Sequence, residues 1–210
     1  MWQFINSRRQ LLLFGLVCLL AACAETPAPV EEAPKTQPVI IRPQVIKPSR
    51  SNPWVLVDTR RDTLSIMSGN RPIEVFYHIA IGSGGAGQKR WRGDEVTPLG
   101  VFRIGWINWH SRFKTFFGLD YPNREYAEQA YREGRISDWD YSNIRYAIDM
   151  GATPPQDTAL GGSIGIHGIG AGDPLVHASY NWTSGCVALD NDQIDRLAQW
   201  VDIGTTVEIR

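Results

Sequence analysis

The sequence predicts a mainly β or α+β domain, and three observations support this. Short runs of β-branched and aromatic residues outnumber the segments with helical spacing. These runs begin the domain, and there is no regular alternation of strand and helix of the kind that builds a doubly wound parallel sheet. The 210-residue chain is 43% hydrophobic and 20% charged, as is usual for one soluble globular domain. Long disorder, a multi-span membrane protein and a collagen-like fibre are therefore excluded.

The charge balance and the cysteine count narrow the class of protein further. The chain has 21 basic and 22 acidic residues, a net charge of -1. That balance disfavours a protein whose main partner is a nucleic-acid backbone, so we expect no nucleic-acid partner. Its three cysteines are too few for a disulfide framework. The domain must therefore be stabilised by a buried core.

The first 22 residues have the pattern of a secretory signal. Arg8 and Arg9 precede an apolar run from residue 11 to residue 20, which is too short to span a bilayer. Small residues then lead to Cys23, and this ending resembles the lipobox that bacteria cleave just before a cysteine. The resemblance implies lipidation of Cys23 and a lipoprotein anchored to the inner or outer membrane, in the periplasm of a Gram-negative-type envelope. The alternative is an ordinary signal peptide cleaved after Ala22 or Ala24.

Residues 23–52 are predicted to be a linker. This stretch is rich in proline and has neither helical nor strand periodicity. We therefore divide the chain into a signal peptide (1–22), a proline-rich linker that begins at the expected lipidation site Cys23 (23–52) and one folded domain (53–210).

The domain is expected to open with an antiparallel sheet. Strands are predicted at residues 54–58, 64–67 and 73–81, and the second and third are separated by a turn signal at 68–71. Further strands are predicted at 100–107, 145–149, 163–167 and 205–209. Helices are predicted at 123–134 and 190–201, the second with Asp190 and Gln193 as a capping pair.

The connection between Phe102 and Arg145 is unusually aromatic. Its rings are Trp106, Trp109, Phe113, Phe116, Phe117, Tyr121 and Tyr126. They could close one side of the core, or they could form a lid or wall of a substrate groove, with Trp109 as a substrate contact. Arg112 and Lys114 lie nearby and could meet a carboxylate.

Cys186 would be the one free thiol of the mature protein, since Cys18 leaves with the signal and lipidation blocks Cys23. A lone thiol in an oxidising compartment is either buried and inert or kept because its thiolate is used. The preceding Ser184 and Gly185 place a tight turn before it, and consecutive N–H groups in such a turn can bind one oxyanion. Both interpretations remain open at this point.

His167 is the leading candidate for a base that activates the thiol. It ends an apolar strand and is followed by a glycine-rich loop that returns the chain to Cys186. His177, inside that loop, is a weaker candidate. A zinc site of His167, His177 and Cys186 is a further alternative, but it offers three ligands at no recognised metal spacing. We therefore predict neither a metal nor another cofactor.

The ordered set of these motifs resembles the L,D-transpeptidase (YkuD) catalytic domain. The signature is His167-Gly168, then the run from Thr183 to Val187 that contains Ser-Gly-Cys. Upstream, Lys89, Gly93 and Asp94 resemble the family's glycine-rich segment, and residues 97–102 resemble its Thr-Pro-x-Gly-x-Phe strand. The match covers roughly residues 53–210 and implies an L,D-transpeptidase-like β-sandwich with a few short helices and an aromatic-rich insert.

The resemblance also implies the role of each site residue. Cys186 would be the nucleophile and His167 its general base, with the carbonyl of Gly168 orienting the imidazole. The backbone N–H groups of Ser184, Gly185 and Cys186 would form the oxyanion hole, and no metal is needed. Further substrate contacts are expected from Trp182, Thr183, Ala188 and Trp109. The implied reaction forms a thioester with the stem peptide of peptidoglycan and transfers it to an amine.

Two departures from the family pattern put the acceptor in question. Ser184 stands where many relatives have histidine, and Ala188 stands where arginine or asparagine is usual. The apolar residue and the long insert resemble the murein transpeptidase-like subgroup, which includes hydrolases that release a lipoprotein from its peptidoglycan link. Three functions follow: a periplasmic cysteine acyltransferase that cross-links or remodels the cell wall, a hydrolase that cleaves stem peptides or frees a peptidoglycan-linked lipoprotein, and a non-catalytic peptidoglycan-binding lipoprotein.

Overall fold

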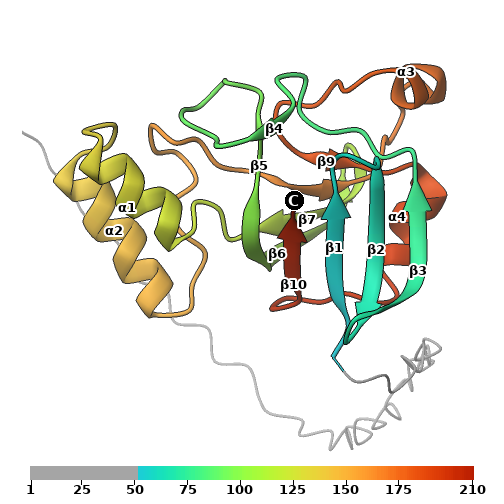
Figure 1. The fold of residues 1–210 in the computed structure, drawn as a ribbon, viewed down its shortest axis with the longest axis horizontal. Helices are drawn as coiled ribbons and strands as arrows, with labels where there is room; N and C mark the ends of the chain where they lie inside the picture. Colours follow the sequence, from blue (N-terminus) through green and yellow to red (C-terminus); the bar gives the residue numbers. More distant parts are fainter. Residues whose placement is uncertain (1–51) are drawn as a thin grey trace, which may run out of the picture. The chain divides into compact units, whose positions relative to one another are not determined.

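The structure is a computed structural model that describes residues 52–210 (Figure 1). The predictions of a signal peptide at 1–22 and of lipidation at Cys23, and the linker up to residue 51, lie outside the described residues. Within residues 52–210, no helix combines the length and the apolar character needed to cross a membrane.

The domain opens with the predicted antiparallel sheet. Strand β1 (Trp54–Asp58) pairs with β2 (Thr63–Ser68), which pairs with β3 (Arg71–Tyr77). Two residues, Gly69 and Asn70, connect β2 and β3, and the positive φ of Gly69 suits a tight hairpin turn. The predicted third strand ends four residues early, because His78 adopts a left-handed conformation with φ of 60°.

The remaining strands extend this sheet to eight strands in the order β3-β2-β1-β10-β6-β7-β8-β9. They are β6 (Gly100–Ser111), β7 (Lys114–Leu119), β8 (Gly165–His167), β9 (Val187–Ala188) and β10 (Thr206–Ile209). The sheet bends, so that in Figure 1 β6 lies beside its partner β10 and β7 continues behind them. Just past β3, Ala80 bridges to Ala188 in β9, and this bridge joins the two edges of the sheet. The segments β4 (Ala86–Gly87) and β5 (Thr97–Pro98) form a separate two-stranded pair.

The core fills the interior between the two halves of the sheet. Alternate residues of the strands point inward, such as Val55 and Val57 in β1 and Phe102 and Ile104 in β6, and each of these is at most 2% exposed. Burying each such side chain contributes about 1.5–3 kcal/mol of transfer free energy. The core therefore fixes the strand register on which the candidate site depends.

A helical pair follows β7 and corrects one prediction. The predicted helix at 123–134 is α1 (Arg124–Arg132). The predicted strand at 145–149 is wrong, because these residues form the end of α2 (Asp138–Asp149). Ser137 caps α2 in a full capping box with Asp140, and only Ile144 on this helix is buried. The capping signal before the segment outweighs the β-prone residues within it.

Two short helices complete the domain. Helix α3 (Pro174–Ser179) lies in the loop between β8 and β9, where Asp173 caps it. Helix α4 (Asn191–Leu197) starts with the predicted capping box of Asp190 and Gln193 and is shorter than the predicted helix at 190–201. A mainly β domain with a few short helices is thus confirmed.

Candidate functional site

Strands β8 and β9 place His167 and Cys186 on one face of the sheet. The two strands are parallel, with Ile166 opposite Val187 and His167 opposite Ala188. Cys186 directly precedes β9, so this register places it beside Gly165, two positions from His167. Because side chains alternate between faces, Cys186 and His167 project from the same face as diagonal neighbours.

Thr183 closes the turn that presents the cysteine. Its hydroxyl donates a hydrogen bond of 2.7 Å to the carbonyl of Cys186 and accepts one of 3.2 Å from the N–H of Gly185. Gly185 has a φ of +119°, and a Cβ there would lie 2.8 Å from the carbonyl oxygen of Val96. Only glycine fits this position without strain.

The expected oxyanion hole has two free donors in this structure. Among residues 52–210, the N–H groups of Ser184 and Cys186 make no hydrogen bond, whereas that of Gly185 is engaged by Thr183. A free N–H group beside a nucleophile can stabilise a developing oxyanion. The arrangement therefore favours Ser184 and Cys186 over Gly185 as donors.

The thiol of Cys186 is held in a desolvated position. It donates a hydrogen bond of 3.4 Å to the carbonyl of Ser163, whose left-handed backbone (φ 54°) precedes β8. Burial raises the pKa of Cys186 to about 11, while the backbone N–H of Gly165 and the charge of Lys89 act in the opposite direction. The resting cysteine is therefore a neutral thiol.

His167 is buried among aromatic rings. Its imidazole stacks on Phe113, with 4.3 Å between ring centroids, and on Phe116, at 5.7 Å, and the ring of Trp182 meets it edge-on at 5.9 Å. Burial lowers the pKa of His167 to about 4, although the hydrogen bond to Gly168 opposes this shift. The resting histidine is therefore neutral.

The carbonyl of Gly168 determines which tautomer His167 adopts. The ring nitrogen Nδ1 lies 2.7 Å from this oxygen, and a carbonyl only accepts, so Nδ1 carries the proton. Nε2 of the neutral ring then has a free lone pair, which is what a general base requires. A side chain on Gly168 would collide with Asn191 and with the carbonyl of Phe113, each 2.8 Å from the added Cβ.

The remaining predicted residues lie at different depths around this pair. Trp182 is beside His167 and donates from Nε1 to Nδ1 of His177 at 3.4 Å. Ala188 is fully buried and bonded on both sides, and the hydroxyl of Thr183 is used inside the turn. Trp109 is 53% exposed and packs edge-on against Phe117, away from the rings around His167.

The aromatic rings of the insert divide between the core and the surroundings of His167. Phe116, Phe117, Tyr121 and Tyr126 are buried in the core. Phe113 stacks on His167, and the guanidinium of Arg112 lies over the ring of Phe113, 4.7 Å from its centroid. Lys114, the other expected cation, forms an ion pair with Asp195. Arg112 is therefore the cation of the insert that lies nearest the predicted base.

Sequence reasoning missed the loop that supports the cysteine turn. Thr97 is fully buried, accepts a hydrogen bond of 2.8 Å from the N–H of Gly82 and contacts the carbonyl of Cys186 at 3.5 Å. The Thr-Pro motif that contains it is recognisable in the sequence, but nothing there places it against residue 186. Within residues 52–210, no group of three or more His, Cys, Asp and Glu side chains could hold a metal ion.

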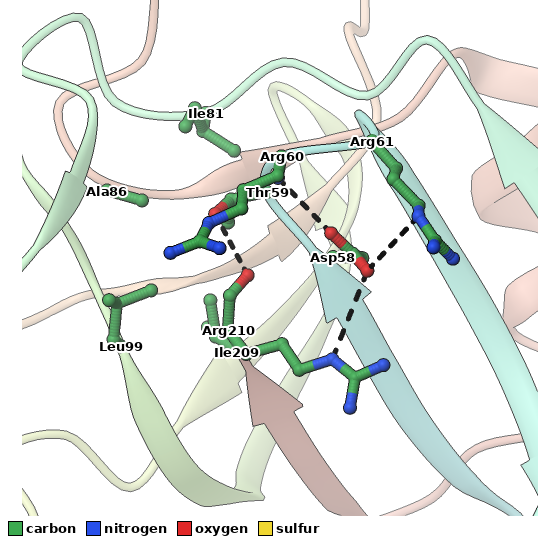
Figure 2. A pocket seen from close by; sticks show the side chains of 9 residues that line it. All are labelled: Asp58, Thr59, Arg60, Arg61, Ile81, Ala86, Leu99, Ile209 and Arg210. Carbon is green, nitrogen blue, oxygen red and sulfur yellow. Dashed lines mark hydrogen bonds and ion pairs between the residues drawn. The ribbon is translucent and has the colours of Figure 1, made fainter.

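A hollow lies where β1 and β10 end. Its volume is about 820 Å³, and Figure 2 shows the nine residues that line it. Arg61 and Arg210 lie around Asp58, whereas the side chain of Arg60 extends toward Ala86 and Leu99. Neither Cys186 nor His167 lines this hollow.

Comparison with known proteins identifies the domain. The family YkuD, the L,D-transpeptidase catalytic domain, matches residues 52–209. Among solved structures, the helical cell shape determining protein Pgp2 from Campylobacter jejuni is 23% identical with a TM-score of 0.51, and a mutant form of it is 24% identical with a TM-score of 0.52. Each match covers 77% of this chain and 48% of the other, so the chain spans about half the length of these structures.

A further structural match carries the enzyme name itself. An L,D-transpeptidase from Xylanimonas cellulosilytica is 17% identical with a TM-score of 0.43, over 78% of this chain and 62% of that one. No curated protein sequence gives a significant match. Because the family match extends over nearly all of the described residues, this chain belongs to the YkuD family of L,D-transpeptidase catalytic domains.

Proposed function

We propose that this protein is a cysteine acyltransferase that acts on the stem peptides of peptidoglycan. The observation that carries the proposal is the placement of Cys186 and His167 on one face of adjacent strands, with Nδ1 of His167 bonded to the carbonyl of Gly168. Family membership supports the substrate class. The protein then acts in cell-wall cross-linking or remodelling.

The first half-reaction begins with two neutral partners. Nε2 of His167 takes the thiol proton of Cys186 as the sulfur attacks the carbonyl carbon of an L-to-D peptide bond. The N–H groups of Ser184 and Cys186 stabilise the oxyanion that forms. His167 then gives its proton to the leaving amine, and a thioester remains on Cys186. Because both pKa values disfavour a resting ion pair, proton transfer accompanies substrate attack instead of preceding it.

In the second half-reaction an amine takes the acyl group. His167 accepts the proton of the attacking amine, and the sulfur leaves as the thiolate that is then protonated. We place Trp182 and Arg112, which both lie close to the ring of Phe113, in the binding surface for the stem peptide. Trp109, Thr183 and Ala188 are further predicted substrate-binding residues. Of these, Thr183 and Ala188 would act by shaping the backbone around Cys186.

A hydrolase is the second candidate, because Ala188 favours it. This fully buried methyl group offers no charge or amide to a carboxylate of an acceptor peptide. Water would then take the acyl group, and the substrate would be a stem peptide or a peptidoglycan-linked lipoprotein. Transferase and hydrolase differ in water exclusion at the groove and share the catalytic pair. A non-catalytic wall-binding lipoprotein is the remaining possibility, and the paired Cys186 and His167 disfavour it.

The location follows from the N-terminal sequence. We propose export to the periplasm and a lipid anchor at Cys23 in the inner or outer membrane, with the domain reaching the wall through its linker. Intact-mass analysis of the membrane fraction tests this proposal, and a Cys23→Ser variant that loses the lipid mass and leaves the membrane would support it. An unmodified Cys23 in the membrane-bound wild type would contradict the anchor.

Product analysis by mass spectrometry tests the activity. The full chain is incubated with tetrapeptide muropeptides and, separately, with peptidoglycan that carries a covalently linked lipoprotein. Cross-linked or amine-exchanged products establish a transpeptidase, whereas trimmed peptides or freed lipoprotein without transfer establish a hydrolase. Absence of any product from both substrates would overturn an enzymatic function.

A further inference from the structure

A buried ion pair lies behind the cysteine turn and takes no part in the proposed mechanism. Lys89 is 2% exposed, and its ammonium contacts the carboxylate of Asp94, whose side chain is 7% exposed. A buried charge is costly unless it is paired and hydrogen-bonded, so a lysine at this depth needs a compensating role or a complete set of partners.

Asp94 is held mainly by the backbone of its own loop. Its carboxylate accepts hydrogen bonds from the N–H groups of Arg90 (2.7 Å), Trp91 (3.2 Å) and Val96 (3.1 Å). Burial alone would raise the pKa of Asp94, but the hydrogen bonds from Lys89 and from these N–H groups lower it. The negative charge of Asp94 is thus shared among several donors, and Lys89 is only one of them.

Two chains of contacts connect this ion pair to Cys186. On one side, the Cε atom of Lys89 lies 3.7 Å from the point that a Cβ atom on Gly161 would occupy. Gly161 stands two residues before Ser163, whose carbonyl accepts the hydrogen bond from the thiol. On the other side, Asp94 fixes Val96, whose carbonyl oxygen packs against Gly185. The ion pair is therefore linked to both segments that hold Cys186, the one that leads to Ser163 and the one that packs against Gly185.

We propose that Lys89 is a positioning residue for the reaction at Cys186. Its buried ammonium, held in place by Asp94, favours the negative charge that develops on the sulfur when the thiol loses its proton and when the thioester breaks. A fixed charge in a desolvated site acts without reorganisation and is screened little by salt. The proposal rests on the proposed function for the role of Cys186 as nucleophile.

Electrostatics supports the geometry. The charge of Lys89 lowers the pKa of Cys186 against the larger effect of burial. Other groups near the ion pair are the hydroxyls of Tyr121 and Tyr126, which interact with Asp94, and Arg135, which donates to the carbonyl of Arg90 at 2.6 Å. Burial raises the pKa of both tyrosines, so neither ionises near neutral pH. Lys89 is thus the group near the thiol whose charge can be removed by one substitution.

The test measures the rate at which iodoacetamide, a neutral probe, alkylates Cys186 between pH 7 and pH 12, a range that includes the thiol pKa of about 11, in the full chain without substrate. Peptide mass spectrometry separates Cys186 from Cys18 and Cys23. We expect Lys89→Met to slow alkylation at pH 8 by at least about threefold and to move the midpoint of the profile upward. Arg90→Met, which removes an exposed charge from the adjacent residue, is the matched control and should stay within about twofold of wild type.

Asp94→Asn separates an electrostatic role from a structural one. Loss of the counter-charge should leave Lys89 unneutralised and move the midpoint downward, opposite to Lys89→Met. Lys89→Arg keeps the charge and should keep the midpoint. Unchanged midpoints in Lys89→Met and Asp94→Asn, or shifts of both in the same direction, would overturn the proposal. If Lys89→Met does not fold, as thermal melting would show, the direction of the shift in Asp94→Asn decides alone.

This readout is independent of acyl transfer. A protein that turns over no muropeptide but shows the opposite shifts would retain the role of Lys89 at the thiol and refute the proposed function. A protein that turns over muropeptide but shows unshifted alkylation profiles would support the proposed function and refute the role of Lys89.

Discussion

At the scale of single residues, the thiol and the imidazole are both kept neutral at rest by burial. Cys186 and His167 are desolvated by different neighbours, the backbone of Ser163 in one case and the rings of Phe113 and Phe116 in the other. A neutral pair differs from the thiolate–imidazolium pair of many cysteine enzymes, because it is poorly reactive until a substrate binds. Low reactivity would protect Cys186 in the oxidising periplasm to which we propose that the chain is exported.

Cys186→Ala should abolish turnover and leave the fold intact. The sulfur is the proposed nucleophile, and the truncation removes one small side chain. Turnover is measured by muropeptide mass spectrometry and folding by thermal melting. A variant that is well folded and still active would refute the assignment of the nucleophile.

His167→Gln should lower turnover by about a hundredfold or more, in the range that general acid–base groups contribute. It should also slow alkylation of Cys186 at neutral pH. His110→Gln, at an exposed side chain on β6, is the matched control. Equal alkylation rates in wild type and His167→Gln would mean that the imidazole and the thiol do not interact.

Thr183→Val should cost about 1 kcal/mol of unfolding free energy, because the N–H of Gly185 and the carbonyl of Cys186 both lose a partner at nearly constant side-chain volume. The loss in turnover, expressed as a free energy, should exceed the loss of unfolding free energy, because the turn also orients the free N–H groups of Ser184 and Cys186. Urea unfolding gives the first quantity and steady-state kinetics the second. Ser184→Ala, at an exposed side chain, serves as the control.

At the scale of elements, capping signals predicted helices better than composition predicted strands. The pair Asp190 and Gln193 marks the start of α4 correctly. The segment 145–149 looks β-prone, yet it completes a helix that Ser137 and Asp140 begin. The hairpin of β2 and β3 was predictable because Gly69 and Asn70 form a local turn. Helix caps and tight turns can be predicted from the local sequence, whereas pairing between distant segments cannot.

The candidate site likewise combines residues that can be identified from the sequence with contacts that depend on the fold. Cys186, His167 and Gly168 are identified by residue type and order. The contact of Thr97 with Cys186 and the stack of Phe113 on His167 arise from non-local packing. The ion pair of Lys89 and Asp94 lies within six residues of sequence, but only the fold buries it beside the cysteine turn.

Ser137→Ala should lower the unfolding free energy by about 1 kcal/mol through loss of the cap of α2. Ser142→Ala, at an exposed site within the same helix, should leave stability unchanged or slightly higher. Chemical unfolding followed by circular dichroism measures both. Equal stability of the two variants would contradict the capping role of Ser137.

At the scale of the whole molecule, stability should fall in acid through His167. Its pKa in the folded state, about 4, lies below the ordinary value of 6.5, so the unfolded chain binds a proton first. The contribution is therefore fully present above pH 6.5 and is lost as the pH falls toward 4, by up to about 3 kcal/mol. Urea unfolding at pH 7.5 and pH 4.5 measures the loss, which should be smaller in His167→Gln. An identical pH dependence in the variant would refute this origin.

The bridge between Ala80 and Ala188 has a consequence for motion at the nucleophile. Although β9 has two residues, its backbone is bonded to Ala80 on one side, at 2.7 and 3.0 Å, and to His167 on the other, where the N–H of Leu189 lies 2.8 Å from the carbonyl. Freeing this strand means opening the sheet at both edges. The amide protons of β9 should therefore exchange with solvent only when the entire domain unfolds. An acyl group on Cys186 would thus be attached next to the part of the domain that opens most slowly.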